Sequence, residues 1–285
     1  MTWPSLSSAK LWCVFIFFAV STLLFSAPAH GQSTIYVPGD YPTIQSAINV
    51  ANNGDIILVA PSTYVENINF NGKAIIVTSS GGPAVTIIDG NHNGTFVTFN
   101  HSETAASVLS GFTIRNGYLD GGSGAGIAIT SASPTIKSNV VTSNHAAVGL
   151  GIFVNGGSPL IQNNTISNND QMNAGDGGSG GGGILIYGGS SGLVQIIGNT
   201  ITNNNMQSGG QGGGISVAGG GAFLQGNLVS GNIAYNEGGG ITAYDVFAPL
   251  TIVQNVVVNN ICSYGKGWRH QFVASLVVCR GLRHQ

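Results

Sequence analysis

The chain has 285 residues, of which 6% are charged, 42% are hydrophobic and 45 are glycine, with a formal net charge of −2. This much apolar content with so little charge is unlike a disordered chain, and the glycines follow no Gly-X-Y period, which excludes collagen. No basic stripe is present to neutralise phosphates, so we expect no nucleic-acid partner.

Residues 1–31 differ from the rest of the chain and predict a secretory signal peptide. Lys10 precedes an apolar run from Leu11 to Phe25, and Ala27-Pro28-Ala29 supplies the small residues of a cleavage site. The run is short for a membrane span, which favours cleavage over anchoring. No second span follows, so we expect a mature chain that is secreted, whether extracellular, periplasmic or on the cell surface.

The next residues predict a short helix followed by short strands. Ile44, Ala47, Ile48 and Ala51 fall at helical spacing, with Pro42 near the first turn. A helix at 43–51 would cover the open end of a stacked structure. Five strands are then expected, each ended by Gly, Pro, Asn or Asp, at residues 55–59, 67–70, 74–77, 85–88 and 96–99.

The second half of the chain is repetitive, with a spacing of about 25 to 35 residues. In each repeat a Gly-x-Gly-Ile motif is followed by a block of the form Asn-x-[Ile/Val]-x-x-Asn. The isoleucines of the motif are Ile127, Ile152, Ile184, Ile215 and Ile241. The asparagine blocks are residues 139–144, 164–169, 199–204, 227–232 and 255–260.

The repeats predict a parallel β-helix. Each block alternates apolar with polar or small residues, the period of a strand, but is too short to bury itself alone. Copies stacked about 4.8 Å apart would form parallel sheets around an apolar interior. Glycine would accommodate positive φ at the corners, and asparagine would tolerate that conformation while hydrogen-bonding to the next layer.

Three short matches between Tyr36 and Glu66 carry a resemblance to a known family. They are Thr43–Ile48 (TIQSAI), Gly54–Val59 (GDIILV) and Tyr64–Glu66 (YVE). The segment resembles the N-terminal coil of pectin methylesterases and related pectin-lyase-like proteins. The later repeats are similar to right-handed β-helix domains of secreted bacterial proteins and to polymorphic outer-membrane adhesins.

The predicted strands and the later repeats together make roughly nine coils over residues 32–261, and the resemblance implies that they form an all-β, single-domain right-handed parallel β-helix. It also implies a protein that binds or processes an extracellular, acidic polysaccharide. The motifs of pectin methylesterases, polygalacturonases and pectate lyases are missing, and a fold alone does not confer an activity. A polysaccharide lyase or glycoside hydrolase and a non-catalytic surface or adhesion solenoid therefore both remain open.

The turns between the asparagine blocks and the glycine motifs collect the reactive side chains. If these turns stack on one edge, Asp120, His145 and Asp170 lie in successive layers about 5 Å apart. Carboxylates so placed suit glycoside hydrolysis, and an acidic edge suits a hard cation such as calcium, although no dedicated metal site is predicted. Ordinary solvated turn residues are the alternative. The catalytic candidates are Asp120, His145, Asp170, Asp176 and Glu237, and the candidates for substrate binding are Tyr118, Tyr235 and Gln211.

Residues 262–285 depart from the repeat. Lys266, Arg269, Arg280 and Arg283 are half of the eight Lys and Arg residues in the chain. One interpretation is a C-terminal cap, tied by a Cys262–Cys279 disulfide that forms after export. The other, which we favour, is that the reading frame has shifted and that the natural protein continues with further coils. The expected partner is a polysaccharide or cell-surface glycan, and we expect a monomer.

Overall fold

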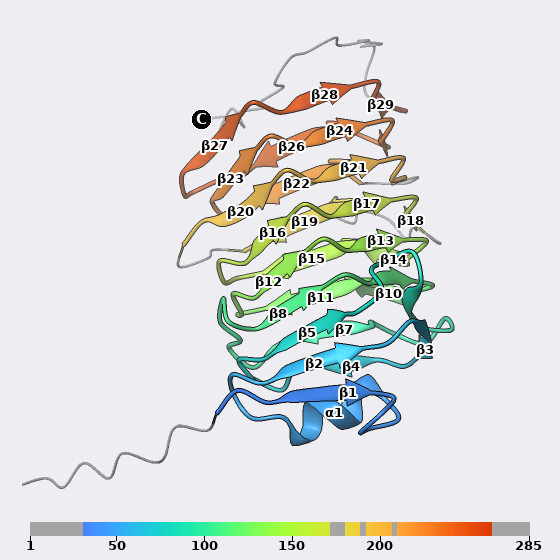
Figure 1. Cartoon of the computed structure of the whole chain (residues 1–285). Coiled ribbons are helices and arrows are strands. Elements are labelled where there is room, and N and C mark those ends of the chain that lie inside the picture. The colour runs from blue at the N-terminus through green and yellow to red at the C-terminus, as the bar shows by residue number, and fades with distance from the viewer. Residues whose placement is uncertain (1–30, 172–179, 189–191, 207–209, 264–285) are drawn as a thin grey trace, which may run out of the picture. The chain divides into compact units, whose positions relative to one another are not determined.

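The computed structural model describes residues 31–171, 180–188, 192–206 and 210–263, all of which belong to the compact unit Gly31–Gln285 (Figure 1). The predicted signal peptide up to His30, Asp176, Cys279 and the four basic residues of the tail lie outside the described residues. Cys262 is exposed, and the two interpretations of the tail, a disulfide-tied cap or a shifted reading frame, both stay predictions.

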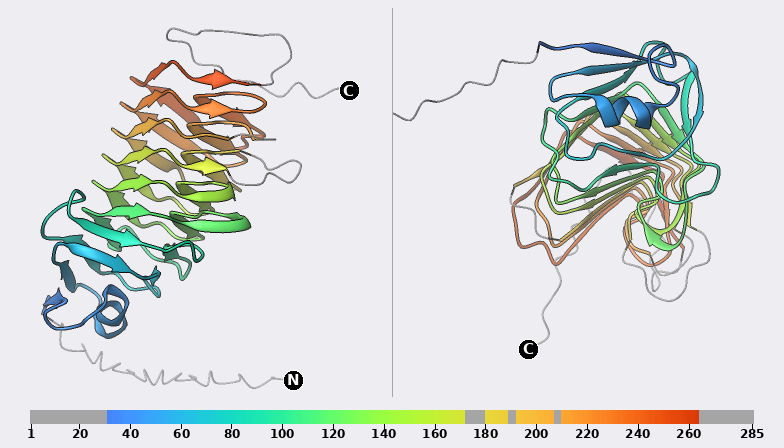
Figure 2. Two further views of the ribbon diagram at one scale, coloured as in Figure 1. Left: turned by 90° about the vertical axis from the view of Figure 1, so that its right-hand side faces the viewer. Right: turned by 90° about the horizontal axis from the view of Figure 1, so that it is seen from below.

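Three parallel sheets wind around one interior, as Figure 2 shows from below. The first sheet contains β1 (Thr34–Val37), β2 (Ile56–Val59), β5 (Ile76–Ser79), β8 (Val108–Ser110), β12 (Thr135–Lys137), β16 (Leu160–Gln162), β20 (Val194–Ile197), β23 (Ala222–Gln225) and β27 (Leu250–Val253). The second contains β3 (Ser62–Val65), β6 (Thr86–Asp89), β9 (Thr113–Arg115), β13 (Val140–Thr142), β17 (Thr165–Ser167), β21 (Thr200–Thr202), β24 (Leu228–Ser230) and β28 (Val256–Val258).

The third sheet completes each coil before the chain returns to the first. It contains β4 (Ile68–Asn69), β7 (Val97–Phe99), β11 (Ile127–Thr130), β15 (Ile152–Asn155), β19 (Ile184–Tyr187), β22 (Ile215–Ala218) and β26 (Ile241–Tyr244). Every strand pair between neighbouring coils is parallel, for example β15 with β19. The sheets hold nine, eight and seven strands, so of the roughly nine predicted coils seven pass through all three sheets.

The isoleucines of the glycine motif form one column of the core. Ile127 pairs in register with Ile152, and the column continues through Ile184 and Ile215 to Ile241. The first four are fully buried, and Ile241 is 8% exposed. The predicted register is therefore confirmed, because alignment on the motif places each isoleucine directly above the previous one.

The asparagine blocks form two buried ladders, one from the first and one from the last asparagine of each block. At each step the backbone N–H and side-chain Nδ2 of one asparagine donate to the Oδ1 of the next, as from Asn169 to Asn204 at 3.2 and 2.8 Å. The same Nδ2 also donates to a backbone carbonyl of the preceding coil, that of Val141 at 3.1 Å. Each ladder thus satisfies buried polar groups that the short strands leave unpaired.

The two roles that the repeats predict for asparagine belong to neighbouring residues in the structure. Positive φ belongs to the residue before each ladder asparagine, for example Ser143 at 55° and Asn168 at 53°. The ladder asparagine itself supplies the hydrogen bonds. At the glycine motif the first glycine has positive φ, as in Gly181 at 93°. The second allows close approach, because a Cβ on Gly183 would lie 2.6 Å from the carbonyl oxygen of Gly214.

Helix α1 (Ile44–Val50) covers the N-terminal end of the stack, as predicted. Thr43 caps it through a reciprocal pair of hydrogen bonds with Ser46. The carboxylate of Glu66 accepts from the backbone N–H groups of Ile44 and Gln45, both at 2.9 Å. At the other end the ammonium of Lys73 donates to the carbonyls of residues 48, 49 and 51. Two opposite charges thus complement the two ends of the helix dipole.

Glu66→Gln and Lys73→Met are each expected to lower the free energy of unfolding by about 1–3 kcal/mol, because each removes charge-assisted hydrogen bonds to a helix end. Urea unfolding gives the size of the loss, and hydrogen exchange should locate it in residues 44–50. Val65→Ala is the control, since Val65 neighbours Glu66 and is 65% exposed. Unchanged stability in both charge variants would show that α1 is held by packing alone.

Candidate functional site

The candidate residues gather where the chain leaves the second sheet and turns toward the third. Here β10 (Tyr118–Ser123), β14 (His145–Val148) and β18 (Asp170–Gln171) form a small parallel sheet. Tyr118 pairs with His145, and His145 pairs with Asp170. A single bridge continues the line from Asp170 to Asn205. We call Tyr118, His145, Asp170 and Asn205 the edge column.

The asparagine ladder fixes where the edge column lies. His145, Asp170 and Asn205 each directly follow the last asparagine of a block, so the buried ladder sets the position of the backbone beside it. In the first layer Gly117 takes the ladder position, and its N–H donates to Asn144 Oδ1 at 2.9 Å. A Cβ on Gly117 would lie 2.7 Å from that oxygen. Glycine is therefore needed for Tyr118 to join the column.

A second, smaller apolar core supports the edge column from behind. It consists of Ala125, Ala146, Leu150 and Met206, which are at most 1% exposed, with Leu119 packed against them. Ala146 lies on β14 next to His145, and Leu119 lies on β10 next to Tyr118. The column side chains consequently project from strands with a packed inner face rather than from loose turns.

The four side chains of the edge column are half-buried. The His145 Nδ1 is buried and has no hydrogen-bond partner in the described chain. The ring of His92 meets that of Tyr118 edge-on, with centroids 6.1 Å apart. The column thus presents a phenol, an imidazole, a carboxylate and an amide in successive layers.

A partly buried charged cluster fixes the turn that precedes Tyr118. The Asp89 carboxylate accepts from Arg115 Nε at 2.9 Å and from Asn116 Nδ2 at 2.9 and 3.0 Å. Burial acts to raise the pKa of Asp89, but hydrogen bonds from Asn116, Asn91 and Arg115 outweigh it and hold this pKa below its usual value. Arg115 is thereby committed to Asp89.

The structure separates the remaining candidates from the edge column. Asp120 lies on β10, one layer before His145 as predicted, but Tyr118 and not Asp120 pairs with His145, and Asp120 is exposed in an irregular part of β10. Tyr118 pairs with His145 because it directly follows Gly117, which occupies the ladder position in this layer. Gln211 and Glu237 pair through a single bridge at the far end of the turns. Tyr235 is half-buried in the turn after β25 (Ile233–Ala234), which pairs with β29 (Ile261–Cys262).

Sequence reasoning missed Asn205 as a member of the column and His92 as a neighbour of Tyr118. A usable signal was present for Asn205, because it follows a block-ending asparagine as His145 and Asp170 do. None was present for His92, whose approach to Tyr118 depends on the bridge between Gly94 and Tyr118.

The side chains of the edge column can all form hydrogen bonds to a ligand. Asp170 is the carboxylate among these four residues, whereas glycoside hydrolysis uses a pair, and the candidate Asp176 lies outside the described residues. Within the described residues no three His, Cys, Asp or Glu side chains gather as metal ligands. The basic residues of the described ranges are Lys73, Arg115 and Lys137, and the first two are committed to α1 and to Asp89.

Comparison with known families decides the class of the protein. Residues 46–234 match a family model described as a right handed beta helix region. The chain belongs to the right-handed β-helix family. No curated protein and no solved structure matches it. In the part of this β-helix that the structure describes, no helix is long and apolar enough to cross a membrane.

Proposed function

We propose that this β-helix binds a polysaccharide along the edge column and does not cleave it. The observation that carries the proposal is the alignment of Tyr118, His145 and Asp170 in one register. Layers about 4.8 Å apart offer one polar side chain each to an extended polymer that lies along the stack. Tyrosine adds an apolar ring face with a hydroxyl at its tip. The resemblance to pectin-lyase-like proteins supports the choice of a polysaccharide.

Binding without cleavage, as in an adhesion solenoid, is favoured by the distribution of carboxylates. Asp120 and Glu237 are exposed, and neither belongs to the column that contains Asp170. Among the described residues, Asp170 therefore has no second carboxylate of the column beside it, and glycoside hydrolysis uses a pair; Asp176 lies outside these residues.

The charge of the edge affects whether it can bind the acidic polysaccharide that the sequence predicts. The described turns supply Asp120, Asp170 and Glu237, and no lysine or arginine lies in the sequence between Lys137 and Lys266. A uronic-acid polymer would therefore need a bridging cation such as calcium, whereas a neutral polymer would not. The extracellular setting of the proposal rests on the sequence of residues 1–31.

Tyr118→Ala, His145→Ala and Asp170→Asn should each weaken polysaccharide binding by about tenfold, because a hydrogen bond contributes about 0.5–1.5 kcal/mol and about 1.4 kcal/mol corresponds to a factor of ten. Affinity electrophoresis in gels that contain neutral polymers, or pectate with and without calcium, measures this loss. Gln162→Ala is the control, because Gln162 is half-buried on the first sheet, away from the edge.

Unchanged migration of all three edge variants in every polymer would overturn the proposed site. Shortening of a polymer by the wild-type protein, lost in Asp170→Asn, would instead establish an enzyme. Chromatography of the polymers after long incubation makes that distinction.

A further inference from the structure

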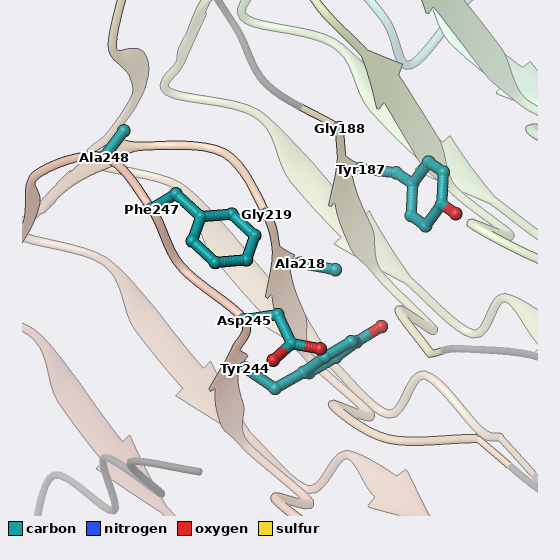
Figure 3. A pocket seen from close by; sticks show the side chains of 8 residues that line it. All are labelled: Tyr187, Gly188, Ala218, Gly219, Tyr244, Asp245, Phe247 and Ala248. Atoms are coloured by element: carbon teal, nitrogen blue, oxygen red, sulfur yellow. The ribbon is translucent and has the colours of Figure 1, made fainter. Parts of the chain in front are cut away.

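Three aromatic residues surround a hollow at the carboxyl ends of third-sheet strands. Tyr187 ends β19 and Tyr244 ends β26, and Ala218 of β22 lies between them in register. Phe247 follows in the turn after β26. The hollow has a volume of about 510 Å³ (Figure 3). It lies at the opposite end of these strands from the turns that contain the edge column.

Two of these three rings are exposed. Phe247 is 78% exposed and Tyr187 is 49% exposed. The turn is not loose, because Val246 packs against the main core. In Figure 3 Tyr187 and Phe247 lie on either side of Ala218. Apolar rings held outward around a hollow are typical of a binding site, because their exposure costs free energy that a ligand recovers.

Small residues keep the space between the rings open. Ala218 lies in register between Tyr187 and Tyr244, and its methyl group leaves space between the two rings. Gly219, which also lines the hollow, has a φ of 82°, a conformation that disfavours any residue with a side chain. The sequence therefore keeps this volume empty between two tyrosines.

Asp245 gives the hollow its polar chemistry. Its side chain is exposed, and in Figure 3 it lies between the rings of Phe247 and Tyr244. A carboxylate accepts hydrogen bonds from hydroxyl groups. The sequence between Lys137 and Lys266 contains no lysine or arginine. The hollow therefore combines ring faces with an acceptor and repels an anionic ligand.

We propose that this hollow binds a neutral pyranose unit of a glycan, with the apolar face of the sugar against Phe247 or Tyr187 and its hydroxyls donating to Asp245. A volume of about 510 Å³ falls in the usual range for small-molecule sites, about 300–1,000 Å³. It suits a mono- or disaccharide. A quaternary ammonium ion would need a close, desolvated cage around one cation, and this hollow is open to solvent. The inference adds a second glycan contact to the proposed function, at a separate place.

The test is isothermal titration with cellohexaose, xylohexaose and mannohexaose. The wild-type chain is compared with Phe247→Ala, Tyr187→Ala and Asp245→Asn. Asparagine retains the backbone preference for the φ of 48° at this position while removing the charge. Each variant should bind at least one neutral hexasaccharide about tenfold more weakly. Tyr36→Ala is the matched control, an exposed tyrosine (52%) on the N-terminal coil.

Melting temperatures should not change, because the altered side chains are exposed, and this separates binding from folding. Equal affinities in wild type and all three variants would overturn the hollow as a site. So would binding of tetramethylammonium or hexagalacturonate, with no neutral hexasaccharide bound.

Repeating the titrations in an Asp170→Asn, His145→Ala background separates this inference from the proposed function. Loss of binding only with edge substitutions would overturn the hollow and leave the edge column standing. Loss only with hollow substitutions would support the hollow and overturn the edge column.

Discussion

Ile184→Asp is expected to lower the free energy of unfolding by about 4 kcal/mol or more, a loss that places it among the most damaging single substitutions. Ile184 is fully buried and lies in register between Ile152 and Ile215. A carboxylate there would face an apolar interior with no cation or hydrogen-bond donor to compensate it. Urea unfolding followed by circular dichroism measures the loss.

Ile215→Asp should lower the free energy of unfolding by a similar amount, because Ile215 occupies the next layer of the same column. Thr130→Asp is the control, since Thr130 ends β11 and is exposed. Wild-type stability of both isoleucine variants would mean that these side chains point outward and that the proposed register is wrong.

Asn169→Ala should lower the free energy of unfolding by roughly 3 kcal/mol or more. The substitution leaves several buried polar groups without hydrogen-bond partners, and each such group destabilises the fold by about 1–3 kcal/mol. Asn169 Oδ1 accepts from the backbone N–H and the Nδ2 of Asn144. Its own Nδ2 donates to Asn204 Oδ1 and to the carbonyl of Val141. The substitution breaks the ladder in both directions.

Asn168→Gly is the matched control for the ladder. Asn168 is the preceding residue, is exposed, and has a φ of 53° that glycine adopts readily. We expect its stability to change by only a few tenths of a kcal/mol. A similar loss in both variants would show that the corner conformation matters and that the ladder does not.

Asn169→Asp keeps the shape of the side chain but replaces a donor with a carboxylate. The new carboxylate would face two acceptors, the Val141 carbonyl and Asn204 Oδ1, in a buried site. Its pKa in the folded protein should be raised, so the destabilisation should be largest at neutral pH and should diminish as the pH falls through that value. Unfolding curves between pH 4 and pH 8 test this sign.

The fold could be predicted because a few recurring residues in each coil determine how neighbouring coils align. The glycine motif recurs once per coil, so Ile127, Ile152 and Ile184 align without any knowledge of the turns between them. The asparagine blocks give the second sheet in the same way, through pairs such as Val141 with Ile166. Local periodicity is enough when every layer repeats the same contacts.

The site was less predictable because its geometry depends on variation between layers. The irregularity of β10 moves Asp120 out of line, and nothing in the turn sequence indicates it. The aromatic hollow brings together Tyr187, Tyr244 and Phe247, which are distant in sequence and become neighbours only through the stacking of β19, β22 and β26. Such a site emerges from the stack and not from a motif.

The central claim is that the β-helix binds a polysaccharide through the edge column without cleaving it. The most direct measurement is affinity electrophoresis of the wild-type chain and the Asp170→Asn, His145→Ala double variant across neutral and acidic polymers. We predict retardation of the wild type by at least one polymer whose length does not change, and loss of that retardation in the double variant. Wild-type migration unaffected by every polymer, or equal retardation of both proteins, would contradict the claim.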